Sequence, residues 1–129
     1  MGRYDLIIFD FDGTLADTAP DIAASANWVL RQTGYPERNL AEVKKAVGRG
    51  VHELLHELSG LPAPGGPDGT VPTRGPLEGD ALEKACQMYR EHYVKNLVVH
   101  TKEYEGVTRM LRGPLADVPK AMVTNKPHV

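Results

Sequence analysis

The chain has 129 residues, with 15 basic and 17 acidic side chains and a formal net charge of −2 at pH 7. This balance argues against nucleic acid as a partner, and no apolar run is long enough to predict a membrane span or a secretory signal. Cys86 is the only cysteine and cannot form an internal disulfide. We therefore expect a soluble protein of the cytoplasm, with one domain and an insertion.

The first predicted element is a strand within residues 4–14, which read YDLIIFDFDGT. Its apolar residues 6–9 are continuous rather than alternating, which predicts a strand buried on both faces of a parallel sheet. Asp10 and Asp12 follow at its carboxyl end, where open α/β sheets bind ligands, and Gly13 allows a turn. If the strand persists, both carboxylates point to the same side. They predict a magnesium site or an acid/base dyad, and the alternative is a simple polar turn.

Helical periodicity dominates the middle of the chain. Helices are predicted to begin at Thr18, Asn39, Val51 and about Asp80, and the first three end near glycines. Capping boxes are expected at the first two starts, where Asp21 and Glu42 stand three residues after the cap. The expected inward residues of the second, third and fourth helices are Leu40, Val43, Val47, Val51, Leu54, Leu55, Leu58, Leu82, Ala85, Cys86, Tyr89, Tyr93 and Leu97. The stretch 61–76 contains five prolines and four glycines and is predicted to be a loop.

One local motif competes with this structural interpretation. His52, Glu53 and His56 match H-E-x-x-H, the zinc-protease helix motif, with both histidines on one helix face. No third ligand follows at the usual spacing, and the two histidines lie beside the apolar stripe of their helix. A solvated helix face is therefore favoured over a zinc hydrolase.

The last predicted elements are a short helix at residues 106–115 and a strand at residues 120–124. A right-handed crossover would make this strand parallel to the first one and adjacent to it. The helical block between them is too large for a simple crossover. It is therefore predicted to be an inserted subdomain.

The stretch FDFDGTL, which contains Asp10 and Asp12, resembles the signature that opens the haloacid dehalogenase-like hydrolases, and residues 123–127 (VTNKP) resemble the second motif of their phosphoglycolate phosphatase-like group. The resemblance implies an α/β fold whose Rossmann-like parallel sheet core is only partly present, in residues 1–15 and 102–129. It also implies that residues 16–101 form an α-helical cap inserted into that core.

The resemblance further implies a magnesium-dependent phosphatase acting on a small phosphorylated metabolite such as phosphoglycolate. Asp10 would be the nucleophile and Asp12 the acid/base, and both would bind Mg²⁺. The phosphate- or substrate-binding residues implied by the motifs are Gly13, Thr14, Thr124, Asn125 and Lys126. Arg49, in a glycine-flanked turn of the cap, would meet a substrate carboxylate or would simply be an exposed turn residue.

The sequence ends at Val129, before the lysine and the acidic motif that such enzymes use next. We expect an N-terminal fragment of a longer enzyme, with little turnover by itself. The alternatives are a truncated gene product and a sheet that is completed by a second chain. A sugar-phosphate mutase and an inactive phosphate-binding module are alternative functions. The exact substrate and the oligomeric state stay open.

Overall fold

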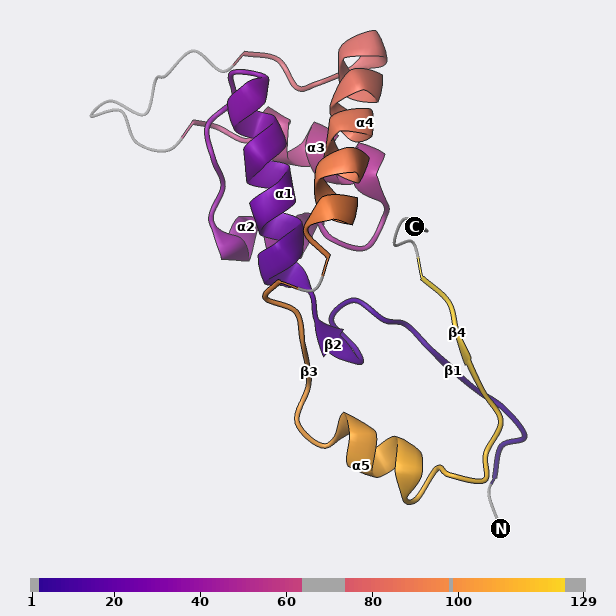
Figure 1. The fold of residues 1–129 in the computed structure, drawn as a ribbon. Coiled ribbons are helices and arrows are strands. Elements are labelled where there is room, and N and C mark those ends of the chain that lie inside the picture. Colours follow the sequence, from indigo (N-terminus) through magenta and orange to yellow (C-terminus); the bar gives the residue numbers. More distant parts are fainter. Residues whose placement is uncertain (1–2, 64–73, 98, 125–129) are drawn as a thin grey trace.

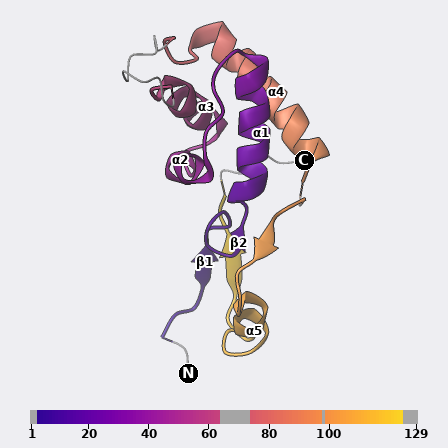
Figure 2. The ribbon, with the colours of Figure 1, turned by 90° about the vertical axis from the view of Figure 1, so that its left-hand side faces the viewer.

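A computed structural model describes residues 3–63, 74–97 and 99–124 of the chain. The elements are β1 (Ile7–Phe9), β2 (Ala16–Asp17), α1 (Ala19–Gln32), α2 (Leu40–Ala46), α3 (Val51–Gly60), α4 (Gly79–Lys95), β3 (Lys102–Glu103), α5 (Val107–Arg112) and β4 (Lys120–Met122). Helices α1–α4 form one end of the molecule, which we call the helical unit (Figure 1). Elements β1, β4 and α5 form the other end, the sheet unit (Figure 2). Strands β2 and β3 belong to the two segments that connect the units, β2 before α1 and β3 after α4.

The two longer strands, β1 and β4, pair in parallel, with Ile7 opposite Lys120 and Phe9 opposite Met122. The prediction of adjacent parallel strands on either side of a helical block is therefore confirmed, as is the α/β class. A second, antiparallel pair joins β2 to β3, with Ala16 opposite Glu103. This pair was not predicted, because two-residue strands contain no periodicity to detect.

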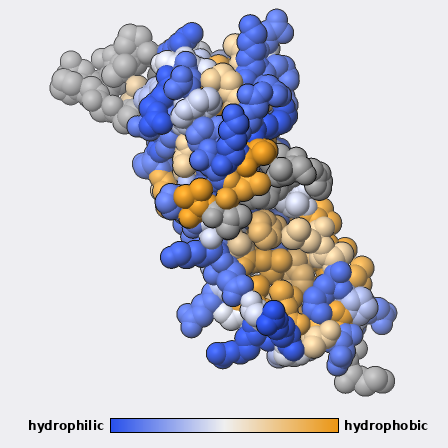
Figure 3. Space-filling view, viewed as in Figure 1, coloured by the Kyte–Doolittle hydropathy of each residue, from blue (hydrophilic) through white to orange (hydrophobic). Residues whose placement is uncertain are grey.

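The first strand is not buried on both faces, so that prediction is wrong. Ile8 is 61% exposed and Leu6 is 50% exposed, and on β4 Met122 is 54% exposed. Within the described chain β1 has one neighbouring strand, and α5, the helix of this unit, contains no buried residue. The apolar run is therefore only partly covered, and apolar surface gathers over this end of the molecule (Figure 3).

The buried core lies in the helical unit, where α1 packs against α2, α3 and α4. The predicted stripes of the third and fourth helices are confirmed at Leu54, Leu55, Leu58, Ala85, Cys86, Tyr89 and Tyr93, all of which are buried. Leu40 is a correction, because it is 41% exposed in the first turn of α2 while Val43 and Ala46 contact the core. No helix of the described residues is both long and apolar enough to cross a bilayer.

The capping box of α2 is confirmed, whereas that of α1 is not. The backbone N–H of Glu42 donates to Asn39 Oδ1 (2.9 Å), and Glu42 Oε2 accepts from the backbone N–H of Asn39 (2.8 Å). Thr18 is the N-cap of α1 but makes no side-chain capping bond. Its hydroxyl donates instead to Asp12 Oδ1 (2.6 Å), because residues 10–16, which we call the aspartate loop, lie against the start of α1.

Asp21 is the expected partner in that capping box. It instead accepts hydrogen bonds from residues 100 and 101, where the chain leaves the helical unit. Its carboxylate accepts from the backbone N–H groups of His100 (2.8 Å) and Thr101 (2.8 Å) and from the Thr101 hydroxyl (2.7 Å). Burial alone would raise the pKa of this carboxyl, but these hydrogen bonds outweigh it and lower the pKa below the ordinary value of 3.8. Asp21 therefore fastens the exit of the helical unit to its entry.

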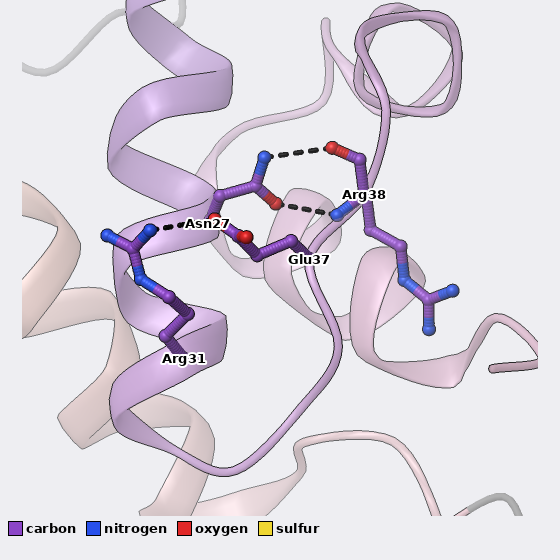
Figure 4. A network of polar contacts seen from close by, with 4 residues as sticks. All are labelled: Asn27, Arg31, Glu37 and Arg38. Atoms are coloured by element: carbon purple, nitrogen blue, oxygen red, sulfur yellow. Dashed lines mark hydrogen bonds and ion pairs between the residues drawn. The ribbon is translucent and has the colours of Figure 1, made fainter. Parts of the chain in front are cut away.

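A buried arginine organises the other end of the helical unit. The Asn27 side chain exchanges two hydrogen bonds with the backbone of Arg38, at 2.8 and 2.7 Å, while Arg31 and Glu37 form an exposed ion pair beside it (Figure 4). The Arg38 guanidinium donates to the carbonyl oxygens of Leu58, Leu61 and Pro62. These carbonyls lie at the end of α3, so Arg38 satisfies acceptors that a helix end leaves without partners.

Candidate active site

The aspartate loop begins where β1 ends, at Phe9, and turns back through residues 11–16. The N–H groups of Thr14 and Leu15 donate to the Phe11 carbonyl oxygen (3.2 and 3.1 Å), and the Gly13 N–H donates to Ala16 O (3.0 Å). Gly13 has φ of +76°, a conformation that residues with a Cβ rarely adopt. The loop is therefore held by its own backbone and presents its side chains from a fixed turn.

Asp10 and Asp12 line the same cavity, although β1 ends before either of them. The cavity has a volume of about 300 Å³ and is lined by Asp10, Asp12, Gly13, Asp17, Thr18, Ala19, Lys44, Val47, Gly48 and Tyr104. Asp10 Oδ1 accepts from the Phe11 N–H (2.9 Å), and Thr18 fixes Asp12. The walls come from the aspartate loop, the β2–β3 region and α2, so the cavity lies between the two units.

A second cavity joins Asp10 to the end of β4. It is lined by Ile8, Phe9, Asp10, Gly48, Val123 and Thr124. Because β1 and β4 are parallel neighbours, their carboxyl ends meet at one edge, and this places Thr124 on the same cavity as Asp10. Asp10 and Gly48 line both cavities, and Asp10 is the ionisable residue that the two cavities share.

The other predicted site residues are placed differently. Thr14 is exposed in the loop and, with Arg49, is absent from the linings of both cavities, whereas Gly48 lines both. The predicted roles of Asn125 and Lys126 lie outside the described residues. The binding roles of Thr14 and Arg49 stay predictions.

Three lining residues were missed by sequence reasoning: Asp17, Lys44 and Tyr104. Asp17 and Tyr104 depend on the β2–β3 pairing, which has no sequence periodicity. Lys44 stands next to Lys45 in a helix of ordinary composition, and only its spacing to Val47 and Gly48, at i+3 and i+4, indicates a shared face. That spacing was the one available signal.

The cavity between the units is acidic. Three aspartates and one lysine line it, so a phosphate dianion would meet net repulsion unless a cation bound there as well. The described residues contain no group of three or more His, Cys, Asp or Glu side chains placed to hold a metal ion. Asp10 and Asp12 still fit Mg²⁺, because this ion keeps several waters and binds through one or two carboxylates together with substrate phosphate oxygens.

The H-E-x-x-H motif has separate structural contacts instead. His52 Nε2 lies 2.5 Å from Glu83 Oε1 on α4, and His56 Nδ1 lies 2.9 Å from the Leu77 carbonyl oxygen. The two histidines thus connect α3 to α4 and to the segment that precedes α4. These contacts favour the structural interpretation over a zinc site.

Comparisons with known proteins agree on one family. The family model described as "Haloacid dehalogenase-like hydrolase" matches residues 7–128. Among curated relatives, the phosphoglycolate phosphatase of Nitrosospira multiformis is 35% identical over 121 residues, covering 93% of this chain and 49% of that protein. The phosphoglycolate phosphatase of Chromobacterium violaceum is 34% identical over 123 residues, covering 93% and 50%.

Solved structures give the same result for the fold. The crystal structure of a predicted phosphoglycolate phosphatase from Haemophilus somnus superposes with a TM-score of 0.79 and 27% sequence identity, covering 98% of this chain and 54% of that one. The chain therefore spans about half the length of the curated relatives it matches.

Proposed function

The chain belongs to the haloacid dehalogenase-like hydrolase family, and from that premise we propose that it carries the nucleophile and the acid/base of a magnesium-dependent phosphatase. The proposed substrate is a small phosphate monoester, and phosphoglycolate is the first to try. The observation that carries the proposal is that Asp10 lines one cavity with Asp12 and another with Thr124. A volume of about 300 Å³ lies at the lower end of the range for ligand sites and suits a small metabolite.

In the proposed first step, a carboxylate oxygen of Asp10 attacks phosphorus and the bond from phosphorus to the ester oxygen breaks. Asp12 donates a proton to that oxygen, so the product leaves as an alcohol. An aspartyl phosphate stays on Asp10, which divides one difficult displacement into two easier steps. The Thr18 hydroxyl, 2.6 Å from Asp12 Oδ1, would hold the acid/base in place.

In the second step, Asp12 takes a proton from water, whose oxygen attacks phosphorus. The bond to Asp10 breaks, inorganic phosphate leaves, and both carboxyl groups return to their starting states. The Thr124 side chain would hold the phosphoryl group, as the resemblance implies. A bound Mg²⁺ would supply charge neutralisation between the carboxylates and the phosphate.

Beryllium trifluoride, which mimics an aspartyl phosphate, provides a test that does not depend on turnover. We expect ¹⁹F NMR to show a bound signal for the chain with Mg²⁺, and we expect Asp10→Asn to abolish it. Asp80→Asn, in the exposed first turn of α4, is the matched control and should keep the signal. A bound signal that persists in Asp10→Asn would contradict the nucleophile assignment.

A further inference from the structure

One cation of the helical unit reaches the acidic cavity. Lys44 lies on α2 and lines the cavity together with Val47 and Gly48, which stand three and four residues later. Val43 and Ala46 are buried and fix the rotation of α2 against the core, and the Asn39 capping box fixes where the helix begins. The position of Lys44 at the cavity is therefore set by the packing of its helix.

The neighbouring lysine provides a natural comparison. Lys45 is also exposed and belongs to the same short helix, but it is not among the residues that line either cavity near Asp10. Successive residues of an α-helix point about 100° apart, so two adjacent lysines face different surroundings. The two residues have the same chemistry and differ in what they face.

The charge of Lys44 is available to a ligand. Within residues 3–63, 74–97 and 99–124, the ion pairs are Arg31–Glu37 and His52–Glu83, and no carboxylate lies within 4 Å of the Lys44 ammonium group. The aspartates come from the sheet-unit side and from β2, whereas Lys44 comes from the helical unit. A substrate whose phosphorus lies at Asp10 would extend its other end toward α2.

We propose that Lys44 determines substrate specificity by binding an anionic group, a carboxylate, at the end of the substrate remote from phosphorus. The inference rests on the proposed function and narrows it to phosphate esters of hydroxy acids. Lysine suits this role because its ammonium group is a compact charge with three donors on a flexible stem. Apart from Lys44, the charged side chains in the described lining of this cavity are aspartates, which would repel a second carboxylate.

The test compares two ligands that differ in the carboxylate alone. Binding of phosphoglycolate and of methyl phosphate to the chain is measured by NMR titration with Mg²⁺ present. We expect Lys44→Met to weaken phosphoglycolate binding about tenfold or more, as for loss of a hydrogen bond to a charged group, and to change methyl phosphate binding little. Lys45→Met is the matched control and should leave both affinities unchanged.

Arg49→Met examines the competing cation. Under the Lys44 assignment it leaves the preference for phosphoglycolate intact, whereas a selective loss with Arg49→Met and none with Lys44→Met overturns the assignment. Equal weakening of both ligands by Lys44→Met also overturns it, because Lys44 would then act only as a general positive charge. If methyl phosphate itself does not bind with Mg²⁺, the proposed function fails, and the Lys44 role fails with it.

Discussion

The helical unit and the sheet unit bury their apolar residues to very different extents. Leu30, Leu55 and Leu58 of the helical unit have no exposed surface, whereas Ile8 and Met122 of the sheet unit are 61% and 54% exposed. Helices α1–α4 cover one another, while a parallel strand pair needs a layer on each face to bury its side chains. The stability of the described chain therefore resides in the helices, and the proposed chemistry resides on the less covered scaffold.

The largest expected effect comes from removing a core side chain in one unit and an apolar side chain in the other. Leu55→Ala should lower the free energy of unfolding by about 2–5 kcal/mol, because it removes buried methyl groups and leaves a cavity. Ile8→Ala should change it by less than about 0.5 kcal/mol, because that side chain is already exposed. Circular dichroism, recorded during unfolding in urea, measures both free energies. Equal losses in the two variants would contradict the conclusion that the two units differ in burial.

A polar contact within the helical unit should matter almost as much. Arg38→Leu should lower the free energy of unfolding by about 2–3 kcal/mol. Three carbonyl oxygens at the end of α3 would lose their donors, one in a buried hydrogen bond and two in partly buried ones. Arg31→Leu is the matched control. Its ion pair with Glu37 is more than half exposed on both sides and should contribute at most about 1 kcal/mol. Unfolding of the two variants at the same urea concentration would mean that the Arg38 hydrogen bonds do not stabilise the end of α3.

The junction between the units should show its own pH dependence. Because the pKa of Asp21 is lowered in the folded state, its contribution to stability is present above 3.8 and is lost as the pH falls below that value through the folded pKa. Asp21→Asn should lower the free energy of unfolding by about 1–2 kcal/mol at pH 7. This loss should become progressively smaller as the pH falls below 3.8.

Unfolding of wild type and Asp21→Asn in urea at pH 7 and pH 3 measures this difference. Asp80→Asn, an exposed aspartate in the first turn of α4, is the control and should show no such convergence. A difference between wild type and Asp21→Asn that stays constant with pH would contradict the prediction.

The smallest expected effect is the pH titration of His92, which lies within the helical unit. His92 stacks on Trp28, with ring centroids 4.6 Å apart, and its Nδ1 lies 2.9 Å from Ser25 Oγ. Burial, with smaller contributions from Arg31 and Lys95, lowers the pKa of His92 below 6.5. Folding thus favours the neutral ring, and the stability gained is present above pH 6.5 and lost as the pH falls through the folded pKa.

Trp28 is the only tryptophan, so its fluorescence is a local probe of this ring. We expect its emission to titrate with a midpoint below 6.5 and the titration to disappear in His92→Gln. The same curve in both proteins would mean that another group is being observed.

The sequence predicted those parts of the fold that depend on a repeated local pattern. The stripes of α3 and α4 and the Asn39–Glu42 capping box follow from the spacing of a few residues. The burial of β1 could not be predicted from its own residues, because it depends on whether other layers of the structure cover the strand. Thr18 and Asp21 have capping chemistry, but their oxygens bond to the aspartate loop and to His100 and Thr101.

The candidate site divides in the same way. The two carboxylates and their shared cavity follow from a motif on one continuous segment. Lys44, Asp17 and Tyr104 were missed because α2, β2 and β3 are brought to the cavity by tertiary packing. The spacing along α2 indicates that Lys44 shares a helix face with Val47 and Gly48. It does not indicate which part of the molecule lies opposite that face.

The pairing of β1 with β4 also has a consequence for the order of folding. The partners come from opposite ends of the chain, so closing this pair directly would cost much loop entropy. Local helices form faster than distant strand pairs, and their packing, with the Asp21 contacts, brings the two connecting segments together first. During synthesis β4 also emerges after helices α1–α5. Asp10 is made early, but it meets Thr124 only after the helices between them have packed.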